Sequence, residues 1–365
     1  MGMHRGLIHT NQTFLALFKL ISDHLSCEVE EYEGGCMENG LVTIVTPVYN
    51  VADYLEEMLR GIQSQTYKNW ELVLVDDGST DNSGTICDEF CRKEPRARVI
   101  HQQNYGQAAA RDVAIAASEG EWLVFADADD VVHPRYIERM IAAAHSHGAD
   151  ITECGFVEFE ESIPCLPTGN GNVARIVYGR EEVAQIAFDC QTMIMALWGK
   201  LFRIELFDNI FCPEGQLYED EYLIPRLYSK AKSYCLITDQ LYMYRKRMGS
   251  TMTKGYDQRR ALANIEVFQD RLELFLGKFT MQSDSILLFR HCMSMCTILE
   301  RINASEHTDS LDECASSCVA EIKDKGLQFL KLRHAPMKRK VLVALAIVSP
   351  KAISLLRSIR KRAAL

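Results

Sequence analysis

Long hydrophobic runs are missing from this sequence of 365 residues. No stretch reaches the roughly 18 apolar residues that suggest a membrane-spanning helix, and the best run, Val341–Val348, has only eight. The N-terminal stretch Phe14–Ile21 is interrupted by Lys19, and no small-residue cleavage site follows it, so it is not typical of a secretory signal. We therefore expect a soluble or peripheral protein. Residues 1–40 are expected to be an extension of uncertain order, with Met37 as a candidate start.

The sequence also lacks the cysteine spacings of metal sites and disulfide frameworks. Its 13 cysteines are odd in number, and no pair has the C-x-x-C spacing. Three pairs lie four residues apart and so share a helix face, but no histidine cluster completes a zinc site; they are Cys87/Cys91, Cys292/Cys296 and Cys314/Cys318. We expect reduced, mostly buried thiols of a cytosolic protein, where cysteine behaves as a small hydrophobic residue.

A basic excess is absent as well. Lys and Arg number 40 against 50 Asp and Glu, which gives a formal net charge of −10. This balance argues against a general nucleic-acid binder, because such proteins need positive charge to meet phosphates. The charge is uneven: residues 331–365 hold ten basic and no acidic side chains, whereas the remaining chain holds 30 basic and 50 acidic ones. A composition of 47% hydrophobic and 25% charged residues excludes a disordered or collagen-like chain.

Strands and helices are expected to alternate between residues 42 and 150. Short β-branched apolar runs predict the strands, and apolar residues at helical spacing predict the helices between them. The expected strands are Val42–Val45, Trp70–Val75, Arg98–His101 and Trp122–Ala126, and the expected helices are Tyr54–Gln65, Thr80–Arg92, Gly106–Ser118 and Pro134–His147. This alternation predicts a largely parallel sheet covered by helices, whose ligands bind beyond the carboxyl ends of the strands.

Two groups of carboxylates lie at those strand ends. Asp76 and Asp77 follow the second expected strand, and Asp127, Asp129 and Asp130 follow the fourth. Two carboxylates two residues apart can reach one hard cation, and Mg²⁺ and Mn²⁺ prefer such oxygen ligands and often share them with substrate phosphates. An isolated D-x-D pair is more often a solvated turn. Its position after a buried strand makes this one a candidate site.

Three further groups could bind a nucleotide at the same edge. Tyr49 follows the first strand and could stack on a base, and Asp77 could accept hydrogen bonds from a base or a ribose hydroxyl. Arg111 lies on an Ala-rich helix preceded by Asn104-Tyr105-Gly106, where both the helix start and the guanidinium favour phosphate. Each of these, taken alone, is also compatible with ordinary turn or surface chemistry.

Taken in order, the motifs carry a resemblance to a known family. They read TPVYN, VDDGSTD, NYGQAAAR and FADADD, followed by LWGKLF (197–202), YEDE (218–221) and YMYRKR (242–247), then GST. Over roughly residues 41–255 the chain resembles the inverting family 2 glycosyltransferases, which have a GT-A fold. It looks like the branch that builds bacterial capsule, exopolysaccharide or lipopolysaccharide.

The resemblance implies a role for each matching residue. Pro47 and Tyr49 would line the nucleobase pocket, and Asp77 would bind the base (uracil). Arg111 would approach the base or diphosphate, and Asp127 would support the ribose or sugar. Asp129 would bind Mn²⁺ or Mg²⁺, and Asp220 would be the general base. Many relatives have Asn where this chain has Asp112, so an extra negative charge is expected near the phosphates.

Two residues are candidates for the acceptor side. Trp198 could present an aromatic face to the acceptor sugar, although core packing explains it equally well. Glu219 precedes the expected base in the Glu-Asp pair, and the alternative for this acidic run is a charged helix start.

The expected fold is therefore α/β, of GT-A (Rossmann-like) type, with a mostly parallel sheet flanked by helices and a helical C-terminal region. We expect a nucleotide-sugar half (41–150), an acceptor and catalytic-base half (151–255), a helical region (256–337) and a basic amphipathic tail (338–365). The tail would either lie on an anionic membrane surface or pack on the acidic body.

The expected function is transfer of a sugar from a nucleotide-diphosphate donor, a UDP-sugar, to a saccharide or lipid-linked saccharide hydroxyl. The protein would be cytoplasmic, or peripheral on the cytoplasmic face of the membrane. A sugar nucleotidyltransferase is one alternative, but it would be expected to carry a Gly-rich basic loop near the first strand, where TPVYN stands. A non-catalytic sugar-binding protein is the other alternative, and it would tolerate loss of Asp129 and Asp220.

Overall fold

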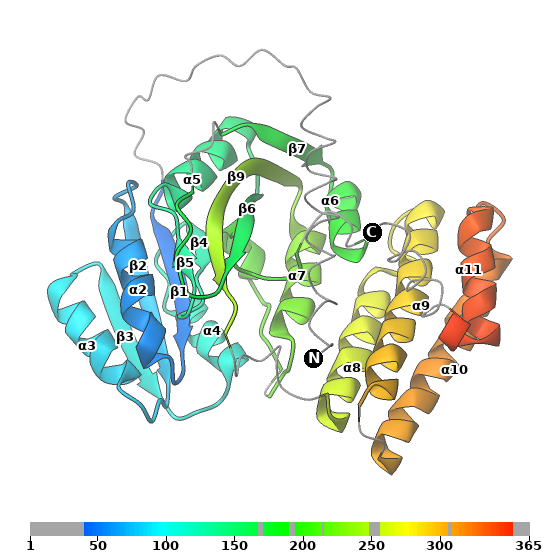
Figure 1. Ribbon diagram of the computed structural model, residues 1–365. Helices are drawn as coiled ribbons and strands as arrows, with labels where there is room; N and C mark the ends of the chain where they lie inside the picture. Colours follow the sequence, from blue (N-terminus) through cyan, green and yellow to red (C-terminus); the bar gives the residue numbers. More distant parts are fainter. Residues whose placement is uncertain are drawn as a thin grey trace.

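A computed structural model describes residues 40–166, 171–189, 194–213, 215–247, 256–305 and 308–352. Figure 1 shows an α/β body built around one sheet, with a group of long helices beside it. The expected extension 1–40 lies, except for Gly40, outside the described residues, as does the end of the tail from residue 353.

One nine-stranded sheet forms the body, in the order β3-β2-β1-β4-β8-β6-β9-β5, with β7 paired to β9. The strands are β1 (Val42–Val48), β2 (Trp70–Asp77), β3 (Ala97–Gln102), β4 (Trp122–Phe125), β5 (Val131–Val132), β6 (Ile151–Phe159), β7 (Val173–Tyr178), β8 (Lys200–Arg203) and β9 (Ser233–Arg245). The first four are mutually parallel, as predicted. Strand β8 then runs antiparallel between β4 and β6, so the whole sheet is mixed.

Helices cover both faces of the sheet. In the body they are α2 (Ala52–Gln63), α3 (Ser83–Lys93), α4 (Gln107–Ala116), α5 (Tyr136–His147), α6 (Arg180–Asp189) and α7 (Glu219–Lys230), with a 3₁₀ turn, η1 (Ile204–Phe207). Because strand side chains alternate between the faces, Ile44 joins the core under α2, α3 and α5, and Val45 joins the core under α4, α6 and α7. Both faces are thus apolar, which is typical of a covered parallel sheet.

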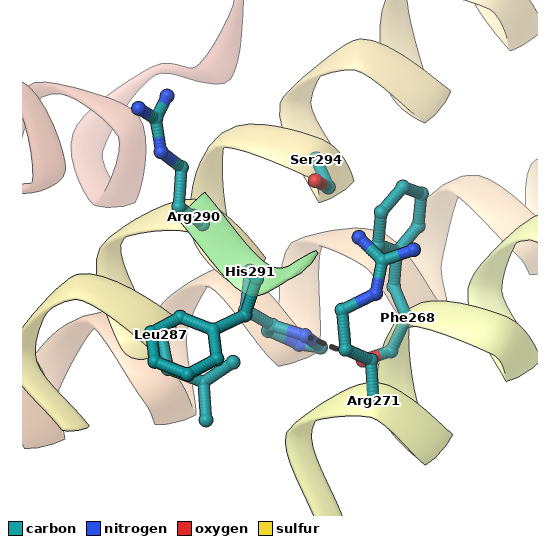
Figure 2. Close-up of a pocket in the computed structure, with 7 residues that line it drawn as sticks. Phe268, Arg271, Leu287, Arg290, His291 and Ser294 are labelled. Atoms are coloured by element: carbon teal, nitrogen blue, oxygen red, sulfur yellow. Dashed lines mark hydrogen bonds between the residues drawn. The ribbon is translucent and has the colours of Figure 1, made fainter. Parts of the chain in front are cut away.

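The C-terminal region is helical, as expected. It consists of α8 (Gln258–Phe275), α9 (Met281–Asn303), α10 (Asp309–Lys331) and α11 (Met337–Val348), and these helices lie side by side in Figure 1. Helices α8 and α9 meet the body at α6 around a small cavity, which Figure 2 shows with Phe268, Arg271 and His291 around it. The ring of His291 bonds the Phe268 carbonyl at 3.2 Å and, through Nε2, Glu321 on α10 at 2.8 Å. Side-chain bonds therefore join three helices here.

The structure describes most of the cysteines and the apolar content of the helices. The ten cysteines there are free thiols and seven of them are buried, including both members of the Cys292/Cys296 and Cys314/Cys318 pairs. None of the helices in the described ranges is long and apolar enough to cross a membrane.

The first part of the tail packs on the helical region. Val343 and Ala346 of α11 are fully buried, in clusters with residues of α9 and α10. Gly326 of α10 allows this approach, since a Cβ there would lie 2.9 Å from a methyl group of Ile347. Of the two alternatives expected for the tail, membrane contact or packing on the rest of the protein, the inner face of α11 therefore follows the second.

Candidate active site

The loops that follow β1 and β2 are joined by Asn50. This residue has a left-handed backbone (φ 51°), and its Oδ1 accepts bonds from the Thr80 N–H at 2.8 Å and the Asp81 N–H at 3.3 Å. The neighbouring Tyr49 is 48% exposed, and Pro47 is partly buried. The structure therefore leaves the Tyr49 ring accessible at the edge of the sheet, where the sequence predicts a nucleobase pocket.

Asp77 connects the loop that follows β3 to the loops that follow β1 and β2. It is 3% exposed, and its Oδ1 accepts bonds from Gln102 Nε2 at 2.7 Å and the Tyr105 N–H at 2.9 Å, while Oδ2 accepts one from the Gly106 N–H at 2.8 Å. Gly78 is required beside it, because its φ is +70° and a Cβ would lie 2.9 Å from a backbone nitrogen. Asp77 thus positions the entry to α4, and its contact with a base stays a prediction.

Strand β9 clamps the Asp127–Asp130 turn. Asp130 is 2% exposed; its Oδ2 accepts a bond from the Tyr242 hydroxyl at 2.7 Å, and its Oδ1 accepts one from the Arg245 N–H at 2.7 Å. The same hydroxyl accepts a bond from the Asp127 N–H at 3.1 Å. The turn is thereby fixed, with Asp127 and Asp129 directly before the buried Asp130.

Arg111 joins the two halves of the site. Its guanidinium is 1% exposed and donates to Asp127 Oδ1 at 2.9 Å, to Asp220 Oδ1 at 3.2 Å and to Glu219. Asp127 follows β4, whereas Glu219 and Asp220 open α7, so one side chain on α4 brings together residues more than 90 positions apart in sequence. The predicted base therefore lies in the same cluster as the predicted sugar-binding carboxylate.

Burial and mutual repulsion control the protonation of these carboxylates. Burial raises the pKa of Asp220 to about 7, because the lowering effect of Arg111 is smaller than desolvation together with the nearby charges of Glu219 and Asp127. Burial likewise raises the pKa of Asp127 and, strongly, that of Asp130. Burial would lower the pKa of Arg111, but Asp220, Glu219 and Asp127 raise it more, so the guanidinium stays charged.

The Asp127–Asp129 pair is compatible with the expected divalent cation. The described residues contain no group of three or more His, Cys, Asp and Glu side chains able to hold a metal, but Mg²⁺ and Mn²⁺ commonly use one or two carboxylates together with substrate phosphates. Arg247 Nε lies 2.5 Å from Asp129 Oδ2. A bound cation would therefore compete with Arg247 for that oxygen, or use Oδ1.

Three other sequence candidates are located by the structure. Trp198 is 9% exposed and stacks on Tyr242 and Tyr244, with ring centroids 4.7 and 5.4 Å away, so core packing accounts for it. Glu219 pairs with Arg111. Asp112 accepts a bond from the Cys212 N–H at 3.0 Å, which ties α4 to the segment before α7.

Some residues of the site had no predicted role. These are Asp130, Tyr242, Arg245 and Arg247, which build and flank the Asp127–Asp130 turn. The motif YMYRKR contains three of them. This motif lies at the end of β9, and β9 pairs with β5, the strand directly after the turn. That pairing brings the motif to the site.

Comparison with known proteins identifies the family. Residues 43–211 match the family model described as glycosyl transferase family 2. The glycosyltransferase GlyG of Streptococcus pneumoniae is 35% identical over 247 residues, which make up 64% of this chain and 79% of GlyG. The chain belongs to glycosyltransferase family 2.

Solved structures support the same assignment at the level of the fold. This family 2 glycosyltransferase aligns with Staphylococcus aureus TarS (residues 1–349, in complex with UDP-GlcNAc) at a TM-score of 0.57 and 19% identity, over 84% of this chain and 90% of that one. The mannosyltransferase PcManGT of Pyrobaculum calidifontis, in complex with GDP-Man and Mn²⁺, aligns at a TM-score of 0.52 and 16% identity, over 94% and 96%. The expected GT-A fold is confirmed, and the family assignment favours glycosyl transfer over both alternatives considered from the sequence.

Proposed function

We propose that this family 2 glycosyltransferase transfers a sugar from a UDP-sugar to a saccharide or lipid-linked saccharide hydroxyl, with inversion at the anomeric carbon, in cell-surface polysaccharide synthesis. The observation that carries the proposal is the placement of Asp220. It lies at the start of α7, next to Arg111 and the Asp127 side of the site, with its pKa raised to about 7. A carboxylate with that pKa accepts a proton near neutral pH more readily than an ordinary surface aspartate.

The donor would bind across the loops after β1, β2 and β4. Tyr49 and Pro47 would enclose the base, and Asp77 would approach it with the lone pairs left by its backbone bonds. Asp127 would contact the ribose or the sugar. The UDP-GlcNAc named with TarS is consistent with such a donor, and a uracil base is part of the proposal.

Asp129 would hold Mn²⁺ or Mg²⁺ together with the donor diphosphate. When bound, the cation would neutralise charge on the leaving diphosphate as a Lewis acid. Arg111 keeps the two halves of the site in register and stabilises the ionised form of Asp220. Asp220 then takes the proton of the acceptor hydroxyl as that oxygen attacks the anomeric carbon from the face opposite the diphosphate. Activity should rise as the pH passes upward through about 7, where Asp220 becomes the carboxylate.

The test is nucleotide release from a panel of UDP-sugars with Mn²⁺ and pooled saccharide acceptors. Asp220→Asn should bind UDP as the wild type does but lose about 10²–10⁴-fold in transfer, which is the usual contribution of a positioned base. Asp208→Asn, the same change on an exposed residue outside the site, is the matched control. Transfer by Asp220→Asn close to that of the control would reject Asp220 as the base.

A further inference from the structure

Helix α11 has an outer face that is apolar and exposed. Met337, Val341, Leu345 and Val348 are 73, 52, 37 and 83% exposed. Their spacing of four, four and three residues places them on one side of the helix. Val343 and Ala346, on the other side, are buried against α9 and α10. The helix is thus apolar on two sides, because apolar side chains also cover the side that faces away from α9 and α10.

Basic residues border this outer face. At 100° per residue, Lys338 lies to one side of the exposed apolar row, and Lys340 lies to the other. Lys331 and Arg333, just before the helix, are exposed. The sequence contains no acidic residue from position 331 to its end. The outer face of α11 therefore combines an apolar row with positive charge alone.

We propose that the outer face of α11 docks on an anionic lipid surface, with the helix lying in the plane of the membrane. The apolar row would enter the boundary between headgroups and acyl chains, while the long lysine side chains on both sides reach back to the anionic headgroups. Charge also argues against a second copy, because a two-fold interface through this face would set like charges against each other. Figure 1 shows α11 at the outer end of the helical region, away from the sheet.

This inference rests on the proposed function in one respect: docking on the membrane would bring the enzyme to a lipid-linked acceptor. The two can fail separately, because vesicle binding needs neither donor nor transfer. Asp220→Asn should bind vesicles as the wild type does.

The experiment is co-sedimentation of the full chain with vesicles of phosphatidylcholine alone, or of phosphatidylcholine mixed with phosphatidylglycerol. We expect binding to the anionic vesicles, weaker binding at high salt, and little binding to the neutral ones. Val341→Asp combined with Val348→Asp should abolish binding, and both positions are exposed enough for the fold to persist. Lys338→Ala and Lys340→Ala should each weaken binding about fivefold, the factor expected for one basic residue near an anionic surface.

The control is Ile176→Asp on β7, which makes one such apolar-to-Asp change on an exposed residue of the body (38% exposed). It should bind anionic vesicles like the wild type. Three results would each overturn the proposal: no binding to anionic vesicles, equal binding to neutral ones, or binding that the Val341/Val348 variant retains. A dimer seen by light scattering that this variant dissociates, without vesicle binding, would assign the face to a second copy instead.

Discussion

Asp220 lowers the stability of the fold in a pH-dependent way. In the unfolded chain its carboxyl ionises near pH 4, whereas in the folded protein burial holds the proton until about pH 7. Between these values the folded state binds more protons than the unfolded one, so this residue makes the protein less stable as the pH rises, and its cost is complete above pH 7. The group that we propose as the catalytic base is thus one whose ionised form folding disfavours.

Asp220→Asn should therefore stabilise the protein at pH 8 and have little effect near pH 4.5. We expect a gain on the order of 2 kcal/mol at the higher pH, measured by thermal or urea unfolding. Arg111 keeps Asp127 and Glu219 as partners in the variant, so it is not left as an uncompensated buried charge. Asp208→Asn, on the surface, should show no such difference between the two pH values. Destabilisation by Asp220→Asn at pH 8, or an equal gain at both pH values, would contradict the argument.

At the residue scale, the sequence located the carboxylates better than their partners. Asp127 and Asp220 could be named because each stands in a short motif at a predictable place. The pairing of both with Arg111 could not be deduced, since α4 and α7 are joined only by the fold. Asp130 was one more acid in a run, and only burial and its bonds to β9 distinguish it from its neighbours.

Among the elements, α7 carries the proposed base Asp220, and α8 holds α7 in place. Tyr218, which precedes α7, has a left-handed backbone (φ 59°), a conformation that costs free energy in a bulky residue and needs outside support. Arg226 of α7 makes two bonds to Asp270 of α8, at 2.6 and 2.5 Å. Glu221, next to Asp220, pairs with the buried Arg271 of α8. The helical region thus acts on the site through the position of α7.

We expect Asp270→Asn to lower kcat roughly tenfold while leaving UDP affinity unchanged. A displacement of α7 by less than 1 Å is sufficient, because a shift of that size can cost about 100-fold. The donor loops after β1, β2 and β4 lie outside this contact. The measurements are kcat from donor turnover and Kd from UDP titration, together with the acidic limb of the pH profile, which should move with the environment of Asp220.

Glu56→Gln, which breaks the exposed Glu56–Arg60 pair on α2, is the control, since such surface pairs contribute little. If Asp270→Asn lowered stability but left kcat and the pH profile unchanged, α8 would have only a structural role.

At the element scale, the sequence predicted the first half of the sheet well. The expected strand Trp70–Val75 extends to Asp77, and the expected helix Pro134–His147 begins at Tyr136, so the differences are confined to the ends. Strand β8 was not predicted. It has four residues, and it enters the sheet beside β4 although about 75 residues separate the two in sequence. Local periodicity carries no signal for such an insertion, because tertiary packing decides it.

Charge is distributed unevenly over the whole molecule, and the division matches the candidate site and the outer face of α11. The net −10 of the sequence conceals a body of −20 and a segment 331–365 of +10. In the body, six carboxylates gather around the candidate site against three arginines, and they are Glu57, Asp127, Asp129, Asp130, Glu219 and Asp220 against Arg111, Arg245 and Arg247. The basic segment includes the exposed Lys338 and the half-buried Lys340 of α11. A donor with a diphosphate thus meets a negative site, whereas an anionic membrane meets a positive helix.

We expect this imbalance to make donor binding dependent on a cation. UDP with Mn²⁺ should raise the unfolding temperature by several degrees, since a ligand at 100 times its Kd adds about 2.7 kcal/mol. UDP with EDTA should raise it far less, because the diphosphate would then face the carboxylates directly. Asp129→Asn should remove most of the Mn²⁺-dependent part, while Asp208→Asn should keep it. An equal shift with UDP in EDTA would show that Arg247 and its neighbours neutralise the diphosphate without a metal, and Asp129 would lose its assigned role.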